Sequence, residues 1–110
     1  MEFNIIATIG TDEVELRPYP GGATAEVPAD RVRKIYTMIL TNTATAENTL
    51  TINIYKEGNA EASLSLIVPA STTISITSNK LPLLAIPGKR TLKAVASAAS
   101  IVLVMTCIDE

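Results

Sequence analysis

From Lys34 onward, short apolar segments alternate with turn residues along the sequence. The apolar Leu50, Ile52 and Ile54 alternate with polar residues in "NTLTINIYK", and the segment "ASLSLIV" repeats this pattern. A period of two places successive side chains on opposite faces of a sheet, so each segment has one face suited to burial. A helical period of useful length is absent from the sequence. The pattern therefore predicts antiparallel β structure.

The length and the composition favour a single β-sandwich. A chain of 110 residues fits one domain, because a second core could not bury enough apolar surface to offset its own chain entropy. Hydrophobic residues make up 47% of the chain and aromatic residues 4%, so the core must be built from Ile, Leu, Val and Ala. We expect residues 1–110 to form one all-β domain, an antiparallel sandwich of jelly-roll or Ig-like type with about eight short strands.

The strands are expected where apolar runs lie between Gly, Pro and Asn residues. Their expected ranges are residues 3–9, 14–17, 23–27, 34–43, 48–56, 62–68, 72–78, 92–97 and 101–108. Turns are expected in "PYPGG", at Gly58 and Asn59, at Pro69 and Ala70, at Pro87 and Gly88 as type II, and in "SAAS". The segment "SNKLPLLAIPGKR" is expected to cross the fold without pairing, because its prolines remove ladder donors.

Residues 1–33 are less regular than the rest of the chain. Prolines and glycines interrupt this part, so only short edge strands are expected after the first strand. We expect this irregular N-terminal part to dock the sandwich onto a partner.

The stretch from Ala94 to Ile108 contains no charged residue. It is shorter than the roughly 20 apolar residues that a membrane-spanning helix needs, and its β-branched centre "IVLVM" favours a buried strand. Both faces of this strand are apolar, whereas a free sandwich covers only one of them. We therefore expect the second face to form a subunit interface, with Leu103 and Val104 as candidate interface residues.

The residue types that enzymes and metal sites use are scarce in this sequence. Histidine is absent, which excludes imidazole bases and histidine-ligated metals. Cys107 lies in an apolar run, where a thiol is usually an inert small hydrophobe. The segment "PGKRT" lacks the earlier glycine and the hydroxyl of a phosphate loop, and "TDEVE" lacks the spacing of a calcium loop. We predict a non-enzymatic protein that uses no cofactor and no metal.

The charge balance argues against nucleic acid and anionic membranes as partners. The chain has 9 Lys and Arg against 11 Asp and Glu, a net charge of -2. Its basic residues gather in "DRVRK" and "KRTLK", of which Arg31, Arg33, Lys89 and Arg90 are candidate interface residues. These cations are either ordinary surface charges or contacts to the acidic stretches "TDEVE" or "IDE" of an adjacent copy.

Residues 34–110 resemble a pattern of small virion proteins of tailed bacteriophages. The pattern has an opening strand that ends in Asn-Thr, here within "IYTMILTNTATAENTLTINIY", followed by a polar hairpin and "SLIVPASTTISI". It ends in a leucine-rich link, here "NKLPLLAIPGKRTLKAVASAASIVLVMTCIDE". The residues that match the link are Leu84, Pro87, Gly88, Leu92, Ala94, Ala96 and Val104. The sequence departs from the pattern at "GKRT", where the family form has an acid after the glycine.

The resemblance implies a β-sandwich that binds major capsid or tail proteins and acts by contact. The expected protein is a capsid (head) decoration protein of the virion, made in the host cytoplasm, that stabilises the assembled shell. Its open sheet edges favour a closed homo-oligomer, with a trimer as the expected form. The alternatives are a neck, tail or fibre component of the virion and an Ig-like binding or adhesion module of an exported protein. The acidic start "MEFN" does not resemble an export signal and favours the virion.

Overall fold

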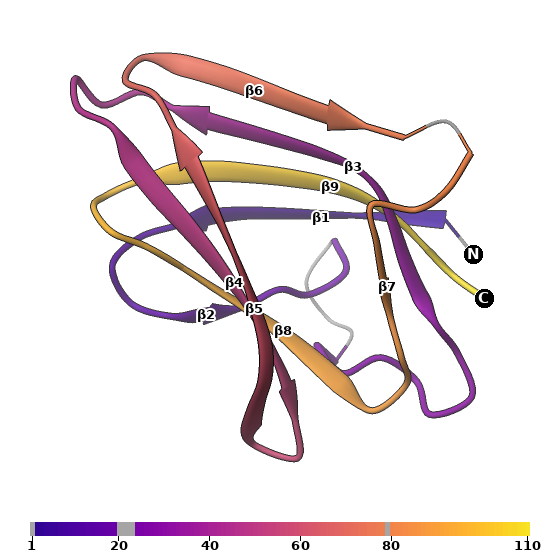
Figure 1. Cartoon of the computed structure of the whole chain (residues 1–110). Helices are drawn as coiled ribbons and strands as arrows, with labels where there is room; N and C mark the ends of the chain where they lie inside the picture. The colour runs from indigo at the N-terminus through magenta and orange to yellow at the C-terminus, as the bar shows by residue number, and fades with distance from the viewer. Residues whose placement is uncertain (1, 20–23, 79) are drawn as a thin grey trace.

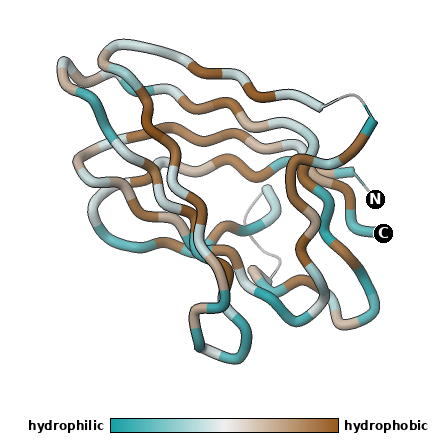
Figure 2. The backbone as a smooth tube through the Cα atoms, in the orientation of Figure 1, coloured by the Kyte–Doolittle hydropathy of each residue, from teal (hydrophilic) through white to brown (hydrophobic). Residues whose placement is uncertain are grey.

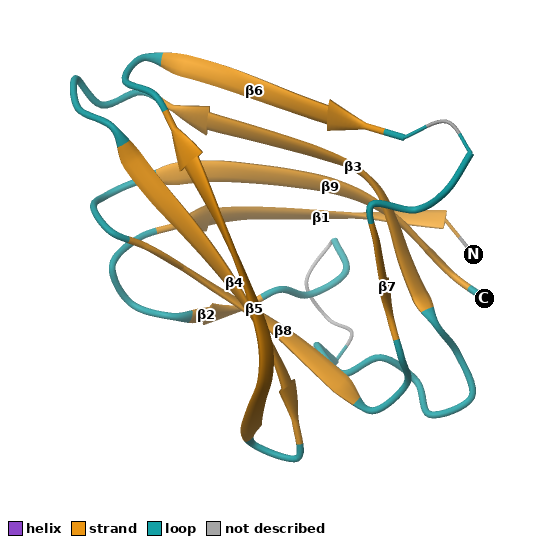
Figure 3. Cartoon of the chain, in the orientation of Figure 1, coloured by secondary structure: helices purple, strands orange, loops and turns teal. Residues whose placement is uncertain are grey.

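The computed structural model describes residues 2–19, 24–78 and 80–110, and these parts contain strands and no helix (Figures 1 and 3). The all-β prediction is therefore confirmed. The strands are β1 (Glu2–Ile9), β2 (Val14–Glu15), β3 (Arg33–Asn42), β4 (Asn48–Lys56), β5 (Asn59–Val68), β6 (Thr72–Thr77), β7 (Leu84–Ile86), β8 (Arg90–Ala96) and β9 (Ile101–Asp109).

The strands form two antiparallel sheets that pack face to face (Figure 1). One sheet has the order β1-β9-β3-β6, with β7 paired to one end of β3, and the other has the order β2-β8-β4-β5. The pairs are nested along the chain, since β4 pairs with β5, β3 with β6, β2 with β8 and β1 with β9. Rolling one long hairpin into two layers produces this arrangement. It fits the jelly-roll form of the predicted sandwich and not the Ig-like form.

Apolar side chains from both sheets form one core between the layers. Figure 2 shows hydrophobic and hydrophilic residues alternating along the strands that contribute to it. The alternation predicted for β4 and β8 is confirmed, because Leu50, Ile52, Leu92 and Ala94 are all buried. Burying one such aliphatic side chain contributes about 1.5–3 kcal/mol. The largest fully buried side chains are Ile5, Ile9, Leu16, Ile35, Met38, Leu40, Leu50, Ile52, Ile86, Leu92, Ile101 and Leu103.

Two turns lie one residue away from their predicted positions. The β4–β5 hairpin turns at Glu57 and Gly58, whose φ angles are 53° and 82°, and Asn59 already pairs with Lys56. Positive φ at both central residues defines a type I′ turn, whose twist matches the twist of the flanking strands. In the turn before β8, the positive φ of 66° belongs to Lys89 instead of the preceding glycine. The predicted type II turn centred on Pro87 and Gly88 is therefore wrong.

The leucine-rich link contains a strand that was not predicted. Residues Leu84–Ile86 pair with residues 33–35 of β3, so the expected crossing without pairing is wrong for this part. Pro82 and Pro87 lie outside this short strand. The prolines therefore bound the pairing instead of preventing it.

The N-terminal part is built into the sandwich. Its first strand, β1, pairs with β9 along its whole length, and Leu16, Ala25 and Val27 are buried in the core. The strand predicted over residues 23–27 is reduced to a single bridge between Glu26 and Thr91 among the described residues. The predicted "PYPGG" turn extends over residues 20–22, which lie outside the described residues. Docking by this part stays a prediction, and its deletion would remove β1.

Two buried asparagines hold the loops at one end of the sandwich. Asn42, the asparagine of the Asn-Thr strand end, donates its Nδ2 to the backbone oxygens of Ala46 at 3.0 Å and Val68 at 3.1 Å. Asn48 donates to the backbone oxygen of Ala98 at 2.8 Å and accepts the backbone N–H of the same residue at 3.0 Å. Each amide thus joins turns that lie far apart in the sequence. Among the described residues, no buried side-chain nitrogen or oxygen is left without a hydrogen-bond partner.

Candidate functional site

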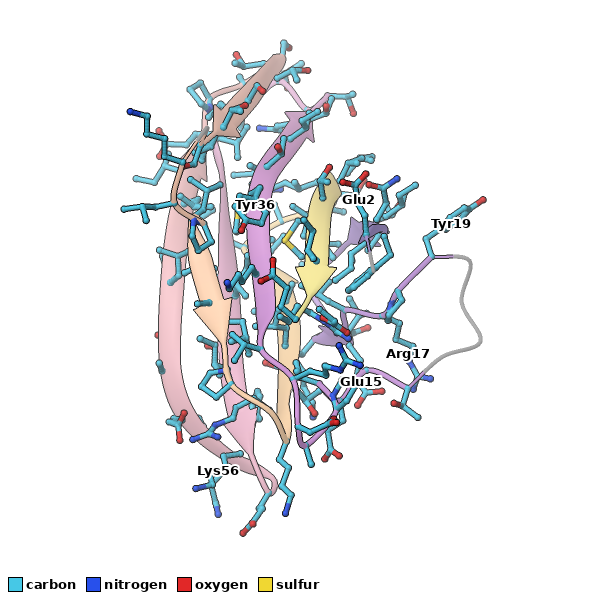
Figure 4. The ribbon with its side chains drawn as sticks, turned by 90° about the vertical axis from the view of Figure 1, so that its right-hand side faces the viewer. Glu2, Glu15, Arg17, Tyr19, Tyr36 and Lys56 are labelled. Atoms are coloured by element: carbon cyan, nitrogen blue, oxygen red, sulfur yellow. The ribbon has the colours of Figure 1, made fainter. Side chains whose placement is uncertain are left out.

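Three loops meet at one end of the sandwich and carry basic side chains. Lys56 pairs with Arg90 across β4 and β8, and the backbone of Val27 exchanges hydrogen bonds with Lys89 and Arg90 at 2.8 and 2.9 Å. The side chains of Lys56, Lys89 and Arg90 line an open hollow of about 600 Å³, together with Arg31 of the neighbouring loop. We call Arg31, Lys56, Lys89 and Arg90 the basic end. Figure 4 shows Lys56 near the tip of the molecule.

A glycine lets the loops of the basic end approach each other. A Cβ atom on Gly88 would lie 2.6 Å from the backbone oxygen of Pro28 and 2.5 Å from that of Ala29. No side chain fits at these distances, so the position requires glycine for close backbone approach and not for its φ angle. This contact places Lys89 beside the loop that carries Arg31.

The cations of the basic end differ in their contacts. Arg90 binds Glu61 through Nε at 3.3 Å and Nη2 at 3.4 Å, and it donates to the backbone oxygen of Gly88 at 3.0 Å. Arg31, Lys56 and Lys89 form no ion pair with any residue that the structure describes. Asp30 and Glu57 are the acids that line the same hollow, so cations outnumber acids there. Such a surface favours an acidic partner.

The structure places residues of both basic clusters predicted from the sequence around the same hollow. Arg31 comes from the first cluster, and Lys89 and Arg90 come from the second. Lys56 was missed, because as the last residue of a strand it belongs to neither cluster. The sequence feature that could have identified Lys56 is its position directly before the β4–β5 hairpin turn.

Arg33 does not belong to the basic end, and its assignment as a surface cation is wrong. Its side chain is only 3% exposed and binds the carboxylate of Asp109 twice, through Nε at 2.9 Å and Nη2 at 3.0 Å. Its guanidinium also lies 4.8 Å from the ring centre of Phe3, a cation–π contact. Lys34 binds Glu110 at 3.1 Å. The acidic stretch "IDE" therefore contacts the first basic cluster within the same chain.

The second candidate surface is the outer face of the β1-β9-β3-β6 sheet. We define this outer face by the residues that alternate with the buried ones. They are Glu2, Asn4, Ile6 and Thr8 of β1, Val102, Val104, Thr106 and Ile108 of β9, Lys34, Thr37, Ile39 and Thr41 of β3, and Thr73, Ser75 and Thr77 of β6. Ile6 is 44% and Val102 is 38% exposed, which leaves an uncovered apolar surface at the centre of a threonine-rich face.

The two candidate interface residues of β9 have different surroundings. Val104 lies on the outer face and is partly exposed, as the subunit-interface prediction requires. Leu103 points into the core and is 0% exposed. Its assignment to an interface is wrong, because alternation places neighbouring residues of one strand on opposite faces.

The acidic stretch "TDEVE" forms contacts within its own chain. The Glu13 carboxylate accepts hydrogen bonds from Asn53 Nδ2 at 2.8 Å and from the Tyr55 hydroxyl at 3.1 Å. The hydrogen bond to Glu13 raises the pKa of Tyr55, and the amine of Lys93 lies 4.6 Å from the same ring. Among the described residues, no group of three or more acids, cysteines or histidines is placed to hold a metal ion.

Cys107 is buried in the core, as its apolar surroundings in the sequence indicate. Burial raises the pKa of its thiol to about 12, against 9.0 for an exposed cysteine, and nearby Arg33 only partly offsets this effect. The thiolate that a nucleophile needs is therefore nearly absent at neutral pH.

Comparisons with protein-family profiles, with curated proteins and with solved structures find no match to this chain. Within the described part of the chain, no helix has the length and apolar character needed to cross a membrane.

Proposed function

We propose that this chain is a non-enzymatic structural protein of a tailed-bacteriophage virion, and specifically a capsid decoration protein that binds the assembled shell. The observation that carries the proposal is the basic end, where cations from three loops converge around an open hollow. An acidic surface of a major capsid protein is the partner that this charge pattern fits. The resemblance of residues 34–110 to small virion proteins supplies the identity of the larger assembly.

The basic end also offers a reason for the departure of the "GKRT" turn from the virion-protein pattern. The pattern has an acid after the glycine of the "GKRT" turn, whereas this chain has Lys89 there. That residue lies at the basic end, next to the loop of Arg31. A charge reversal at this point fits a partner surface of the opposite sign from the one that the family form would meet.

A decoration protein acts by mass action alone. Binding that requires the assembled shell stabilises it by about 2.7 kcal/mol per site when the free protein is at a hundredfold excess over its Kd. The jelly-roll sandwich suits this role, since such folds occur in viral capsid proteins, although a fold alone does not define a function. A position at the neck, tail or fibre would use the same chemistry on a different partner.

The proposal is tested by sedimentation of phage heads that were assembled without this chain. The purified chain should pellet with the heads, and the double variant Arg31→Glu/Lys89→Glu should bind about tenfold more weakly or worse, because both changes reverse a charge that faces the partner. Lys80→Glu is the matched control, since Lys80 is exposed and does not line the hollow. Equal binding by the double variant, or no binding by the unchanged chain, would contradict the proposal.

A further inference from the structure

We infer that the outer face of the β1-β9-β3-β6 sheet pairs two copies of this chain face to face, about a two-fold axis that runs along β9. This inference is independent of the basic end, which Figure 4 shows well separated from Glu2 of the outer face. The cross-strand register places every outer-face residue in a known row.

The apolar centre of the outer face is a straight row across three strands. Ile6 of β1 pairs with Val104 of β9, and Val104 pairs with Ile39 of β3. Val102 continues this surface along β9, where it lies between Thr8 and Thr41. Side chains that are directly opposite on one face of a sheet are in contact, so the row forms one continuous apolar strip.

The outer face is complementary to itself. In a pair related by a two-fold axis along β9, each cross-strand row of one copy faces the same row of the other. The strand β1 of one copy then lies over β3 of the other. Ile6 then meets Ile39 of the second copy, and Val104 meets its own equivalent on the axis. The flanking threonines of β1 and β3 also lie opposite each other. An interface that matches one patch with itself is the kind that closes into a dimer.

The charges of the face agree with the same axis. Glu2 and Lys34 share one row, on either side of Ile108. Within one copy their backbones are two strands apart, about 10 Å, and the two side chains form no ion pair with each other. The rotation places Glu2 of each copy over Lys34 of the other, so two ion pairs form across the dimer. Lys34 already binds Glu110 at 3.1 Å, so it then lies between two carboxylates.

The other two-fold axis in the plane of the face does not satisfy these charges. An axis along the apolar row would also stack Ile6, Val104 and Ile39 on their equivalents. It would, however, place the row of Glu2 and Lys34 over the loop ends, which are uncharged, at Gly10 and Ser100. The charge pattern therefore selects the axis along β9, and it favours two copies instead of the three that the sequence suggested.

The size of the face sets the conditions of the test. About this axis the strands β1, β9 and β3 of the two copies overlap, and three strands by four rows cover about 14 by 27 Å, an area typical of weak, transient interfaces. The dimer is therefore expected to be of low affinity, and its mass is measured over a concentration series by sedimentation equilibrium.

The decisive experiment mixes two charge variants. The unchanged chain should reach twice its mass of 11.7 kDa, whereas Glu2→Lys alone and Lys34→Glu alone should each raise the dimer dissociation constant about tenfold or more, since each variant opposes like charges. An equimolar mixture of the two variants should form a dimer again, because the introduced lysine of one variant then faces the introduced glutamate of the other and the remaining pair is unchanged. Lys80→Glu, which lies off the outer face, should dimerise normally.

Three results would overturn the inference. They are a chain that stays monomeric at about 500 μM, a chain that reaches three times its mass, or a mixture of variants that stays monomeric. Val104→Asp gives a separate check, because it should abolish the dimer while the thermal unfolding of the monomer remains cooperative. A basic-end variant that still dimerises but no longer binds heads would show that the two surfaces act separately.

Discussion

The buried ion pair between Arg33 and Asp109 offers a sharp test of how this fold is stabilised. The substitution Arg33→Met keeps an unbranched apolar side chain in the core but removes the guanidinium. It eliminates two hydrogen bonds to the Asp109 carboxylate, at 2.9 and 3.0 Å, and the cation–π contact with Phe3 at 4.8 Å.

The magnitude follows from the burial of the two partners. Breaking a buried ion pair by removing one partner costs about 3–5 kcal/mol, because the other charge keeps its desolvation penalty. The Asp109 side chain is 17% exposed and can regain some water, so we expect a loss of about 2–4 kcal/mol. Replacing both partners by apolar residues should cost less than the single change, since no buried charge then remains.

Urea unfolding followed by far-UV circular dichroism measures these differences. The single variant Arg33→Met, the double variant Arg33→Met/Asp109→Met and the unchanged chain are compared at pH 7. Arg17→Met is the matched control, because the Arg17–Glu15 pair is 52% and 39% exposed and should contribute less than about 1 kcal/mol. A loss below about 0.5 kcal/mol for Arg33→Met, or a double variant less stable than the single one, would refute this reasoning.

The remaining predictions concern neighbouring or matched positions. Leu103→Ala should lower the free energy of unfolding by about 2–5 kcal/mol in urea, whereas Val104→Ala should lower that of the monomer by less than about 1 kcal/mol, because only the first is in the core. Gly88→Ala should lower it by about 1–3 kcal/mol, while Gly10→Ala, whose Cβ would meet nothing within 4 Å, should show no steric loss in thermal melts. Between about pH 9 and 12, the unchanged chain should lose about 1.4 kcal/mol per pH unit relative to Cys107→Val, because the raised pKa keeps the folded thiol protonated while the unfolded one ionises. Parallel stability profiles of the two proteins in urea would disprove this.

The strands could be predicted from the sequence because alternation is a local property. Leu50 and Ile52 reveal the inward face of their strand without any knowledge of the fold. The exact turn residues could not be predicted from the sequence, since Glu57 and Lys89 have positive φ angles that local composition does not require. The strand β7 was missed for a related reason, because prolines next to a short strand resemble prolines that prevent one.

The candidate site depends on contacts between distant segments. Arg31 and Lys89 are far apart in the sequence, and the close approach at Gly88 and the backbone hydrogen bonds of Val27 bring their loops together. The buried position of Arg33 did leave a signal, since it is in phase with the inward-facing Ile35. Asp109 is likewise in phase with the buried Cys107, so the period of two places both partners on the inner face.

The proposed role as a capsid decoration protein is tested most directly by the copy number of this chain in purified virions. Quantitative mass spectrometry of purified particles, with the major capsid protein as internal standard, measures that number. A decoration protein should be present in hundreds of copies, in a fixed ratio to the capsid protein. Six or twelve copies would place the chain at the neck or tail instead, and its absence from the particles would contradict a role in the virion.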